Sequence, residues 1–180
     1  MNTQEFFSEL YQSVPPEKVT YCYTLPRRKC EPFAVGQTEQ LAHRAIELSE
    51  ENVYFGLHPM DHAPRPGGRA RTEEITGVAF LHGEYDIRGH GHQEKKLPET
   101  QEEILDFLHA LEQPPSIIVT SGNGVHTYWL LEDYVPVTED NRDKIRRIMR
   151  GHAPTGWLRN TAGSLIRFQI WHAFYVFPEH

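Results

Sequence analysis

Two acidic side chains and one histidine are the residues of this chain whose types and spacing could do chemistry. Glu84 and Asp86 stand one residue apart at the end of the apolar stretch AFLHGEYDI. His126 lies just beyond the segment SGNG in the stretch PPSIIVTSGNGVHTYWLLEDYVPV, which begins at Pro114. Paired carboxylates suit a hard metal ion, and a histidine beside a glycine-rich turn suits an anion. The two stretches would form one site only if the fold brings them together.

The carboxylate pair follows a stretch that is typical of a buried strand. Successive residues of a strand point to opposite faces, so Glu84 and Asp86 share a face and Tyr85 points away from it. Two neighbouring carboxylates repel each other unless a cation lies between them. Mg²⁺ or Mn²⁺, held together with the phosphates of a nucleotide, fits this arrangement. A solvated strand end is the simpler interpretation of the pair taken alone.

The histidine follows a turn made of Ser121, Gly122, Asn123 and Gly124. Such residues tolerate positive φ angles, and their backbone N–H groups can point at an anion. The residues after the turn alternate as in a strand, so His126 can share a sheet face with neighbouring strands. The turn and His126 are therefore candidates for binding a triphosphate. The alternative is a half-buried strand histidine that is hydrogen-bonded to a neighbour.

Helices and strands that alternate along the chain would position these residues. The apolar periodicity predicts helices over 3–13, 38–49, 98–113 and 138–150, and strands over 19–25, 52–59, 75–87 and on both sides of the SGNG segment. A loop is predicted over 59–73, which is rich in proline, glycine and arginine. This order is typical of an α/β or α+β domain with a sheet of four or five strands.

Composition limits the classes of function. The chain has 180 residues and a formal net charge of −7, which argues against a non-specific DNA coat but does not exclude a nucleotide enzyme. No apolar run is long enough to span a membrane, and the first residues lack a signal pattern. Cys22 and Cys30 are too few for a disulfide framework. We expect both to be reduced thiols in a cytoplasmic protein.

Together the two motifs resemble those of the archaeo-eukaryotic primase superfamily, and most closely those of the RepB-like replication primases of plasmids and phages. In that family an acidic-x-Asp motif ends a strand, and a second motif reads Ser-Gly-x-Gly-x-His-x-x-Trp. Both occur here in this order, and the resemblance covers roughly residues 50–150. It implies a primase-type, RRM-like and mostly antiparallel sheet with flanking helices. It also implies that 1–150 is a catalytic domain, with an N-terminal part over 1–49.

The resemblance implies a role for each matching residue. Glu84 and Asp86 correspond to the metal-binding acidic pair, with Glu in place of the commoner first Asp. His126 corresponds to the histidine that contacts the phosphates of the incoming nucleotide. Ser121 opens the same nucleotide-binding motif, which continues with Gly122, Asn123 and Gly124. In such enzymes two Mg²⁺ or Mn²⁺ ions activate the primer 3′-hydroxyl and neutralise the leaving pyrophosphate.

The same resemblance implies the substrates and partners. They are nucleoside triphosphates, a single-stranded DNA template, and a helicase domain or protein, with no membrane. Arg65, Arg69 and Arg71 of the loop over 59–73 are candidate contacts to template phosphates, and an ordinary solvated loop is the alternative. The activity implied is metal-dependent, DNA-directed nucleotidyl transfer.

A third motif of the family has no counterpart in the chain. It reads roughly Asp-Leu-Ala-Arg-x-Leu-Arg-x-Pro-Gly-Thr and supplies a further metal-binding carboxylate. The chain instead continues over 151–180 as GHAPTGWLRNTAGSLIRFQIWHAFYVFPEH. The segment fits no amphipathic pattern, and its end is crowded with apolar residues. A form without the third carboxylate is expected to have little or no polymerase activity.

The genetic code offers an explanation of this tail. We joined the last base of each codon from Phe168 to His180 with the first two bases of the next codon. These junctions permit Pro-Asp-Leu-Ala-Arg-Val-Leu-Arg-Leu-Pro-Gly-Thr. The junctions for Ala and for the second Leu allow no other residue, and both match the motif. We therefore predict a one-base shift between roughly Gly151 and Phe168. The alternative is a genuine C-terminal element that closes the core.

Two other classes of protein stay open. The missing third motif leaves room for a non-catalytic module that binds nucleotide or DNA as a replication accessory, which is the alternative to the enzyme. A rolling-circle replication nickase is the remoter alternative, because such enzymes hold a metal through His-x-His. Here that pattern is His90-Gly91-His92, but it lies in a predicted glycine-rich loop rather than in a strand.

Overall fold

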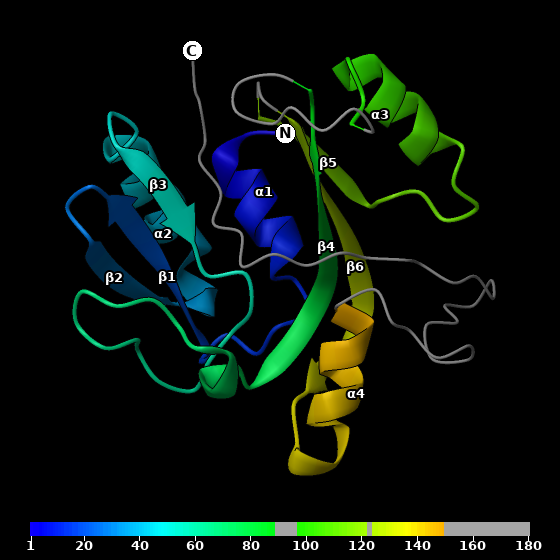
Figure 1. Cartoon of the computed structure of the whole chain (residues 1–180). Coiled ribbons are helices and arrows are strands. Elements are labelled where there is room, and N and C mark those ends of the chain that lie inside the picture. The colour runs from blue at the N-terminus through cyan, green and yellow to red at the C-terminus, as the bar shows by residue number, and fades with distance from the viewer. Residues whose placement is uncertain (89–96, 122–123, 150–180) are drawn as a thin grey trace. The chain divides into compact units, whose positions relative to one another are not determined.

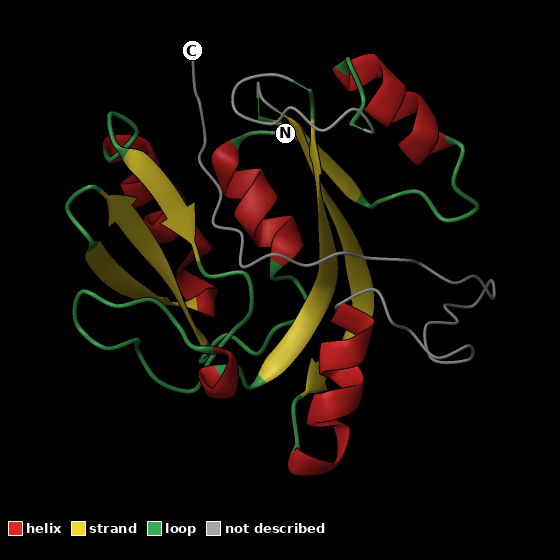
Figure 2. Cartoon of the chain, in the orientation of Figure 1, coloured by secondary structure: helices red, strands yellow, loops and turns green. Residues whose placement is uncertain are grey.

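The computed structural model describes residues 1–88, 97–121 and 124–149 (Figure 1). The described residues form helices and strands in the α+β manner, as Figure 2 shows by type. They group into two compact units. Of the described residues, the first unit contains Met1–Ala79 and Leu131–Thr138, and the second contains those of Phe80–Leu130 together with α4 (Glu139–Met149). Each unit is described by itself below.

The first unit is built on a three-stranded antiparallel sheet in the order β2-β1-β3. The central strand pairs Cys22 with Glu31 on one side and with Phe55 on the other. The elements of this unit are α1 (Thr3–Leu10), β1 (Val19–Leu25), β2 (Lys29–Ala34), a short 3₁₀ turn (Val35–Gln37), α2 (Thr38–Glu47), β3 (Asn52–Phe55) and a second 3₁₀ turn (Thr72–Glu74).

Both faces of this sheet are covered, which explains why β1 is buried along almost its whole length. On one face, α1 packs through Phe7, whose ring meets that of Phe55 at 5.3 Å. The hydroxyl of Tyr11 lies 3.0 Å from that of Thr20 on the same face. On the other face Tyr21 and Tyr23 form a small core with Met60 of the following loop, and Leu25, Cys30, Tyr54 and Ala70 pack against it.

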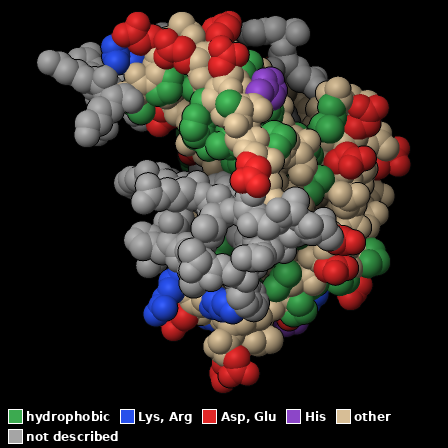
Figure 3. All heavy atoms as spheres, turned by 90° about the vertical axis from the view of Figure 1, so that its right-hand side faces the viewer, with side chains coloured by type: hydrophobic (Ala, Val, Ile, Leu, Met, Phe, Trp, Pro, Cys, Tyr) green, Lys and Arg blue, Asp and Glu red, His purple; other side chains and the backbone are tan. Residues whose placement is uncertain are grey.

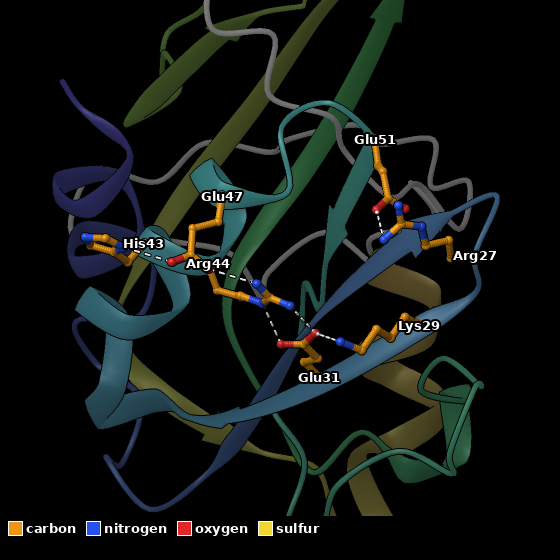
Figure 4. A network of polar contacts seen from close by, with 7 residues as sticks. All are labelled: Arg27, Lys29, Glu31, His43, Arg44, Glu47 and Glu51. Carbon is orange, nitrogen blue, oxygen red and sulfur yellow. Dashed lines mark hydrogen bonds and ion pairs between the residues drawn. The ribbon is translucent and has the colours of Figure 1, made fainter.

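A network of ion pairs joins β2 to α2 (Figure 4). Arg44 donates two hydrogen bonds to Glu31, at 2.7 and 2.8 Å, and a third to Glu47 at 2.8 Å. Lys29 adds an ion pair to Glu31 at 2.6 Å. The bonds from Arg44, then those from Lys29, lower the pKa of Glu31 to about 2. The network therefore fixes an edge strand to the helix that covers it.

The second unit contains strands of a second antiparallel sheet, in the order β4-β6-β5. The elements are β4 (Gly77–Asp86), α3 (Gln101–His109), β5 (Ile117–Thr120), β6 (Gly124–Pro136) and α4 (Glu139–Met149). β5 and β6 form the predicted hairpin, with Ile117 opposite Tyr128 and Val119 opposite His126. Thr100 caps α3 by accepting a hydrogen bond from the Glu103 amide, at 3.2 Å. The residues 77–79 of β4 and 131–136 of β6 group with the first unit.

The α+β class and the antiparallel pairing are confirmed. The described strands lie in two sheets of three, where one sheet of four or five was expected. β2 was not predicted, because KCEPFA carries charge and Pro32. Pro32 is tolerated because β2 is an edge strand, where the backbone N–H that proline lacks is not needed for pairing with a further strand. The predicted strand over 52–59 is shorter, since β3 ends at Phe55.

Two further expectations concern membranes and thiols. None of the helices in the described part of the chain has the length and apolar character needed to cross a bilayer. Both cysteines are free. Cys22 is opposite Glu31 and Cys30 is opposite Tyr23, so the two thiols point to opposite faces of the sheet. Burial raises the pKa of Cys22 to about 12 and that of Cys30 to about 11, so neither thiol is activated.

Candidate functional site

The site residues lie where β4 runs beside β6 in the second unit. The Thr127 hydroxyl donates a hydrogen bond to the Gly83 carbonyl at 3.2 Å. A side chain built at Gly83 would meet the Thr127 hydroxyl, the Tyr85 ring and the Trp129 ring. Residues 83, 85, 127 and 129 therefore share one face of the sheet.

The opposite face carries all three residues singled out by chemistry. By alternation, Glu84 and Asp86 of β4 share it with His126 and Tyr128 of β6. A ring contact between Phe80 and Tyr128, with centroids 5.7 Å apart, supports this assignment. The structure thus brings together the acidic pair and the histidine, which are far apart in the sequence.

The three side chains differ in exposure. Glu84 is exposed and Asp86 is half-buried. His126 is only 7% exposed. The carboxylates therefore face a part of the sheet that solvent ions can reach, and the histidine is set into the packed part of the same face.

Gly124 makes the close approach of the two motifs possible. A Cβ at this position would lie 2.4 Å from the Tyr85 carbonyl oxygen and 3.4 Å from the Asp86 Cα. Both neighbours are backbone, so they could not move aside without separating the strands. The glycine that begins β6 is thus packed directly against the end of the carboxylate strand.

The turn that precedes His126 is closed by its serine. The Ser121 amide donates to the Gly124 carbonyl at 3.0 Å, and the Ser121 hydroxyl donates to the same oxygen at 3.2 Å. The hydroxyl proton of Ser121 is therefore engaged within the turn. Gly122 and Asn123, which were predicted to belong to the nucleotide-binding turn, lie outside the described residues.

A second histidine, His82, shares the face of the acidic pair and was missed at the sequence level. It is 3% exposed and stands two residues before Glu84 in β4. Burial lowers the pKa of His82 to about 4. Burial and the neighbouring His82 lower the pKa of His126 to about 3. Both imidazoles are therefore neutral at pH 7, so His126 can give an anion a hydrogen bond but not a full charge. The same alternation that pairs Glu84 with Asp86 could have identified His82.

The face opposite the acidic pair is covered by α3. The Tyr85 ring meets that of Phe107 at 6.2 Å. The Trp129 indole donates to the Gln113 carbonyl, beyond the end of α3, at 3.0 Å. This packing holds Tyr85 and Trp129 against α3. The residues next to them in the strands, among them Glu84 and Asp86, therefore point to the opposite face of the sheet.

The predicted template arginines belong to the first unit, whereas the acidic pair and His126 belong to the second. Arg65, Arg69 and Arg71 are exposed. The Arg69 guanidinium lies over the Tyr23 ring, 5.6 Å from its centroid. Arg71 forms an exposed ion pair with Glu73 at 3.8 Å.

The donor set for a metal is partial. No group of three or more His, Cys, Asp or Glu side chains is arranged to hold an ion within residues 1–88, 97–121 and 124–149. Glu84 and Asp86 offer two carboxylates on one face, which is the oxygen chemistry that Mg²⁺ or Mn²⁺ takes. The His90-Gly91-His92 pattern of the nickase alternative and the tail over 151–180 lie outside the described residues.

Comparison with known proteins gives partial matches to solved structures alone. No family model matches the chain, and no curated protein sequence matches it. Among solved structures, the AEP domain of the cyanophage S-2L primase-polymerase is 19% identical, with a TM-score of 0.42 over 75% of this chain and 64% of that one. The catalytic domain of the primase RepB′, solved with initiator DNA, is 13% identical, with a TM-score of 0.41 over 83% of this chain and 66% of that one. The chain thus spans about two thirds of each of these structures.

Proposed function

We propose that the chain is a primase-type domain that binds a nucleoside triphosphate with a divalent ion for template-directed nucleotidyl transfer. The observation that carries this proposal is the approach of Gly124 to within van der Waals distance of the Tyr85–Asp86 backbone. It brings the glycine-rich turn next to the end of the strand that carries the acidic pair. Plasmid or phage replication is the setting that we propose, with a helicase and single-stranded DNA as partners.

Each residue has a proposed task. Glu84 and Asp86 would hold Mg²⁺ or Mn²⁺, which supplies charge neutralisation for the phosphates and lowers the pKa of a bound hydroxyl. Neutral His126 would donate a hydrogen bond to the triphosphate, and the turn from Ser121 to Gly124 would offer backbone N–H groups. A cytoplasmic location is part of the proposal. The free thiols of Cys22 and Cys30 favour it, because reducing compartments keep cysteines unpaired.

Two carboxylates alone make a weak metal site, because the affinity for hard ions rises with the number of charged ligands. We therefore propose that this form binds nucleotide and metal but synthesises little or no DNA. A replication accessory that only binds nucleotide or DNA is the second candidate, and the absence of the third motif from the sequence favours it.

Titration calorimetry with Mn²⁺ and a nonhydrolysable nucleotide tests the site. Glu84→Ala combined with Asp86→Ala should abolish Mn²⁺ binding while the melting temperature stays within a few degrees. Glu132→Ala combined with Asp133→Ala removes the same charge from two exposed, adjacent residues of β6 and serves as the control. Unchanged Mn²⁺ affinity in the Glu84/Asp86 variant would rule the metal site out. Metal-dependent dinucleotide synthesis by the unaltered chain would show that it is an enzyme and not a replication accessory that only binds nucleotide or DNA.

A further inference from the structure

His82 is the most deeply buried histidine of the described residues, at 3% exposed, and His126 follows at 7%. Histidines at a surface, as on the face drawn in Figure 3, can exchange hydrogen bonds with water. A buried imidazole depends on the protein instead, because a polar group taken out of water without a partner costs free energy. An apolar residue would fill this place in β4 without that cost, so the ring of His82 calls for an explanation.

Two contacts fix how β4 and β6 are aligned. The Thr127 hydroxyl donates to the Gly83 carbonyl at 3.2 Å, so these two residues lie across from each other. A Cβ on Gly124 would lie 3.4 Å from the Asp86 Cα, which puts that pair opposite as well. In antiparallel strands a step forward along one is a step back along the other, so both contacts give the same register.

This register makes His82 and His126 diagonal neighbours on the face of the acidic pair. It places His126 opposite Glu84, and His82 stands two residues before Glu84 in β4. Ring side chains in diagonal positions of this kind are within reach of each other. Burial and then the nearby His82 lower the pKa of His126, which agrees with two rings that lie close together.

The strand on the other side of β6 presents an apolar residue to His126. β5 pairs Val119 with His126, and the side chain of valine neither donates nor accepts a hydrogen bond. The polar side chains that the two flanking strands turn towards His126 therefore come from β4. Glu84 is exposed and is the proposed metal ligand, whereas His82 is set into the packed part of the face.

Neighbouring imidazoles influence each other through the position of their protons. A neutral imidazole carries its proton on one of two ring nitrogens, so it donates from one edge and accepts at the other. In a poorly hydrated part of a protein the polar edges of adjacent rings interact strongly. The arrangement of His82 therefore favours one tautomer of His126. The tautomer matters, because a neutral His126 can donate to an anion only from the nitrogen that carries the proton.

Packing keeps His82 itself in place. The register sets Tyr128 opposite His82, and the Tyr128 ring meets the Phe80 ring with centroids 5.7 Å apart. Both of these rings are almost completely buried. A side chain in such close-packed surroundings has few rotamers open to it. His82 can thus act as a fixed reference for the ring beside it.

We propose that His82 is a positioning residue, which holds the imidazole of His126 in one tautomer and one orientation. In that state the N–H of His126 points towards the side of the face where the acidic pair lies. His82 is too deeply buried to touch a nucleotide and acts only through His126. The proposal rests on the proposed function only in giving His126 a triphosphate to bind.

Nuclear magnetic resonance shows the tautomer directly and needs no nucleotide. Long-range ¹H–¹⁵N correlation spectra of the full chain, labelled at its 11 histidines, tell which ring nitrogen carries the proton. His126→Gln identifies the signals of His126 by their loss. We expect a single tautomer of His126 in the unaltered chain at neutral pH. A mixture of both tautomers in the unaltered chain would overturn the proposal.

Two variants of His82 separate the polarity of the ring from its volume. His82→Leu has a similar volume but no polar edge, so His126 should become a mixture of tautomers. His82→Gln keeps a donor and an acceptor, so it should restore the single tautomer. An unchanged, single tautomer of His126 in His82→Leu would overturn the proposal.

Nucleotide affinity gives a second readout. His82→Leu should weaken the binding of a nonhydrolysable nucleotide about tenfold, near the lower end for loss of a hydrogen bond to a charged group. His82→Gln should bind more tightly than His82→Leu does. When His126→Ala is already present, His82→Leu should cause no further loss, because the two residues act as a unit. Losses that add in the double variant would overturn the proposal.

Ile104→Val is the matched control. It removes a buried methyl group from α3, which covers the opposite face of the sheet, so it should lower the melting temperature without changing the tautomer or the affinity. A change of tautomer in Ile104→Val equal to that in His82→Leu would overturn the proposal in favour of a general effect of packing. A tautomer that depends on His82, together with normal nucleotide affinity in His126→Ala, would instead contradict only the proposed function.

Discussion

At the scale of single residues, variants of His126 distinguish a role in nucleotide binding from a role in core packing. It is buried, and its pKa is held near 3 by burial and by His82, so it is uncharged under ordinary conditions. If it donates to a triphosphate, His126→Ala should weaken nucleotide binding by about 1.5–3 kcal/mol, the range for a hydrogen bond to a charged group. Calorimetric titration with a nonhydrolysable nucleotide measures this directly.

His126→Gln keeps a hydrogen-bond donor and much of the side-chain volume, so it should bind nucleotide more tightly than His126→Ala does. The melting temperature then distinguishes triphosphate binding from core packing. A side chain that only fills the core would show the reverse pattern in His126→Ala. Nucleotide affinity would be normal, and the protein would melt several degrees earlier because a buried side chain leaves a cavity.

At the scale of elements, the contact between β6 and the end of β4 depends on the absence of a side chain. Gly124→Ala would place a methyl group 2.4 Å from the Tyr85 carbonyl, so the strands must separate there. Overpacking of this kind costs about 1–3 kcal/mol. We expect a lower urea midpoint and weaker nucleotide binding. Gly68→Ala, whose nearest neighbour is at 3.3 Å, is the control. Equal stability of the two variants would contradict the close backbone contact between β6 and the end of β4.

The joint between β2 and α2 predicts an acid sensitivity. The folded state lowers the pKa of Glu31 from its ordinary value of 4.5 to about 2, through Arg44 and then Lys29. The unfolded state therefore binds more protons in this range, and the stability from the network is present above pH 4.5 and lost as the pH falls to 2. Glu31→Gln should cost about 1–2 kcal/mol at pH 7, allowing for partial exposure.

Thermal melting between pH 7 and pH 3 checks this prediction. The Glu31→Gln variant should lose stability less steeply than the unaltered chain as the pH falls below 4.5, because its amide does not titrate. Glu47→Gln removes a more exposed partner of the same arginine and should have a smaller effect. Parallel curves for the Glu31 variant and the unaltered chain would contradict the assignment.

At the scale of the whole molecule, the reading frame decides what the domain can do. A one-base shift between roughly Gly151 and Phe168 would replace the third motif with the tail over 151–180. We predict that the neighbouring frame of the gene encodes Asp-Leu-Ala-Arg, continues through Pro-Gly-Thr, and gives Mn²⁺-dependent synthesis when it is restored. A stop codon before that segment ends, or neither Asp nor Asn at the second junction, would refute the prediction. Sequencing of the gene tests this prediction about the neighbouring frame.

The sequence alone determined the type of most elements and the local geometry of the site. Alternation in AFLHGEYDI put Glu84 and Asp86 on one face with Tyr85 on the other, because strand geometry is local. The hairpin around SGNG could also be predicted, because turn residues lie between two runs of strand-forming residues. The same alternation places His82 on the face of the acidic pair, so this histidine could also have been identified from the sequence.

Tertiary structure decided which strands are neighbours. β6 lies between β4 and β5, although β5 comes first in the chain, so the meeting of Gly124 with Tyr85 and Asp86 depends on long-range pairing. No local preference encodes that choice, since any strand with a matching face could take the place. The same holds for β2, whose Pro32 argues against a strand until its position at a sheet edge is known. The closeness of His82 and His126 is likewise a product of pairing between distant segments, which periodicity along the chain does not contain.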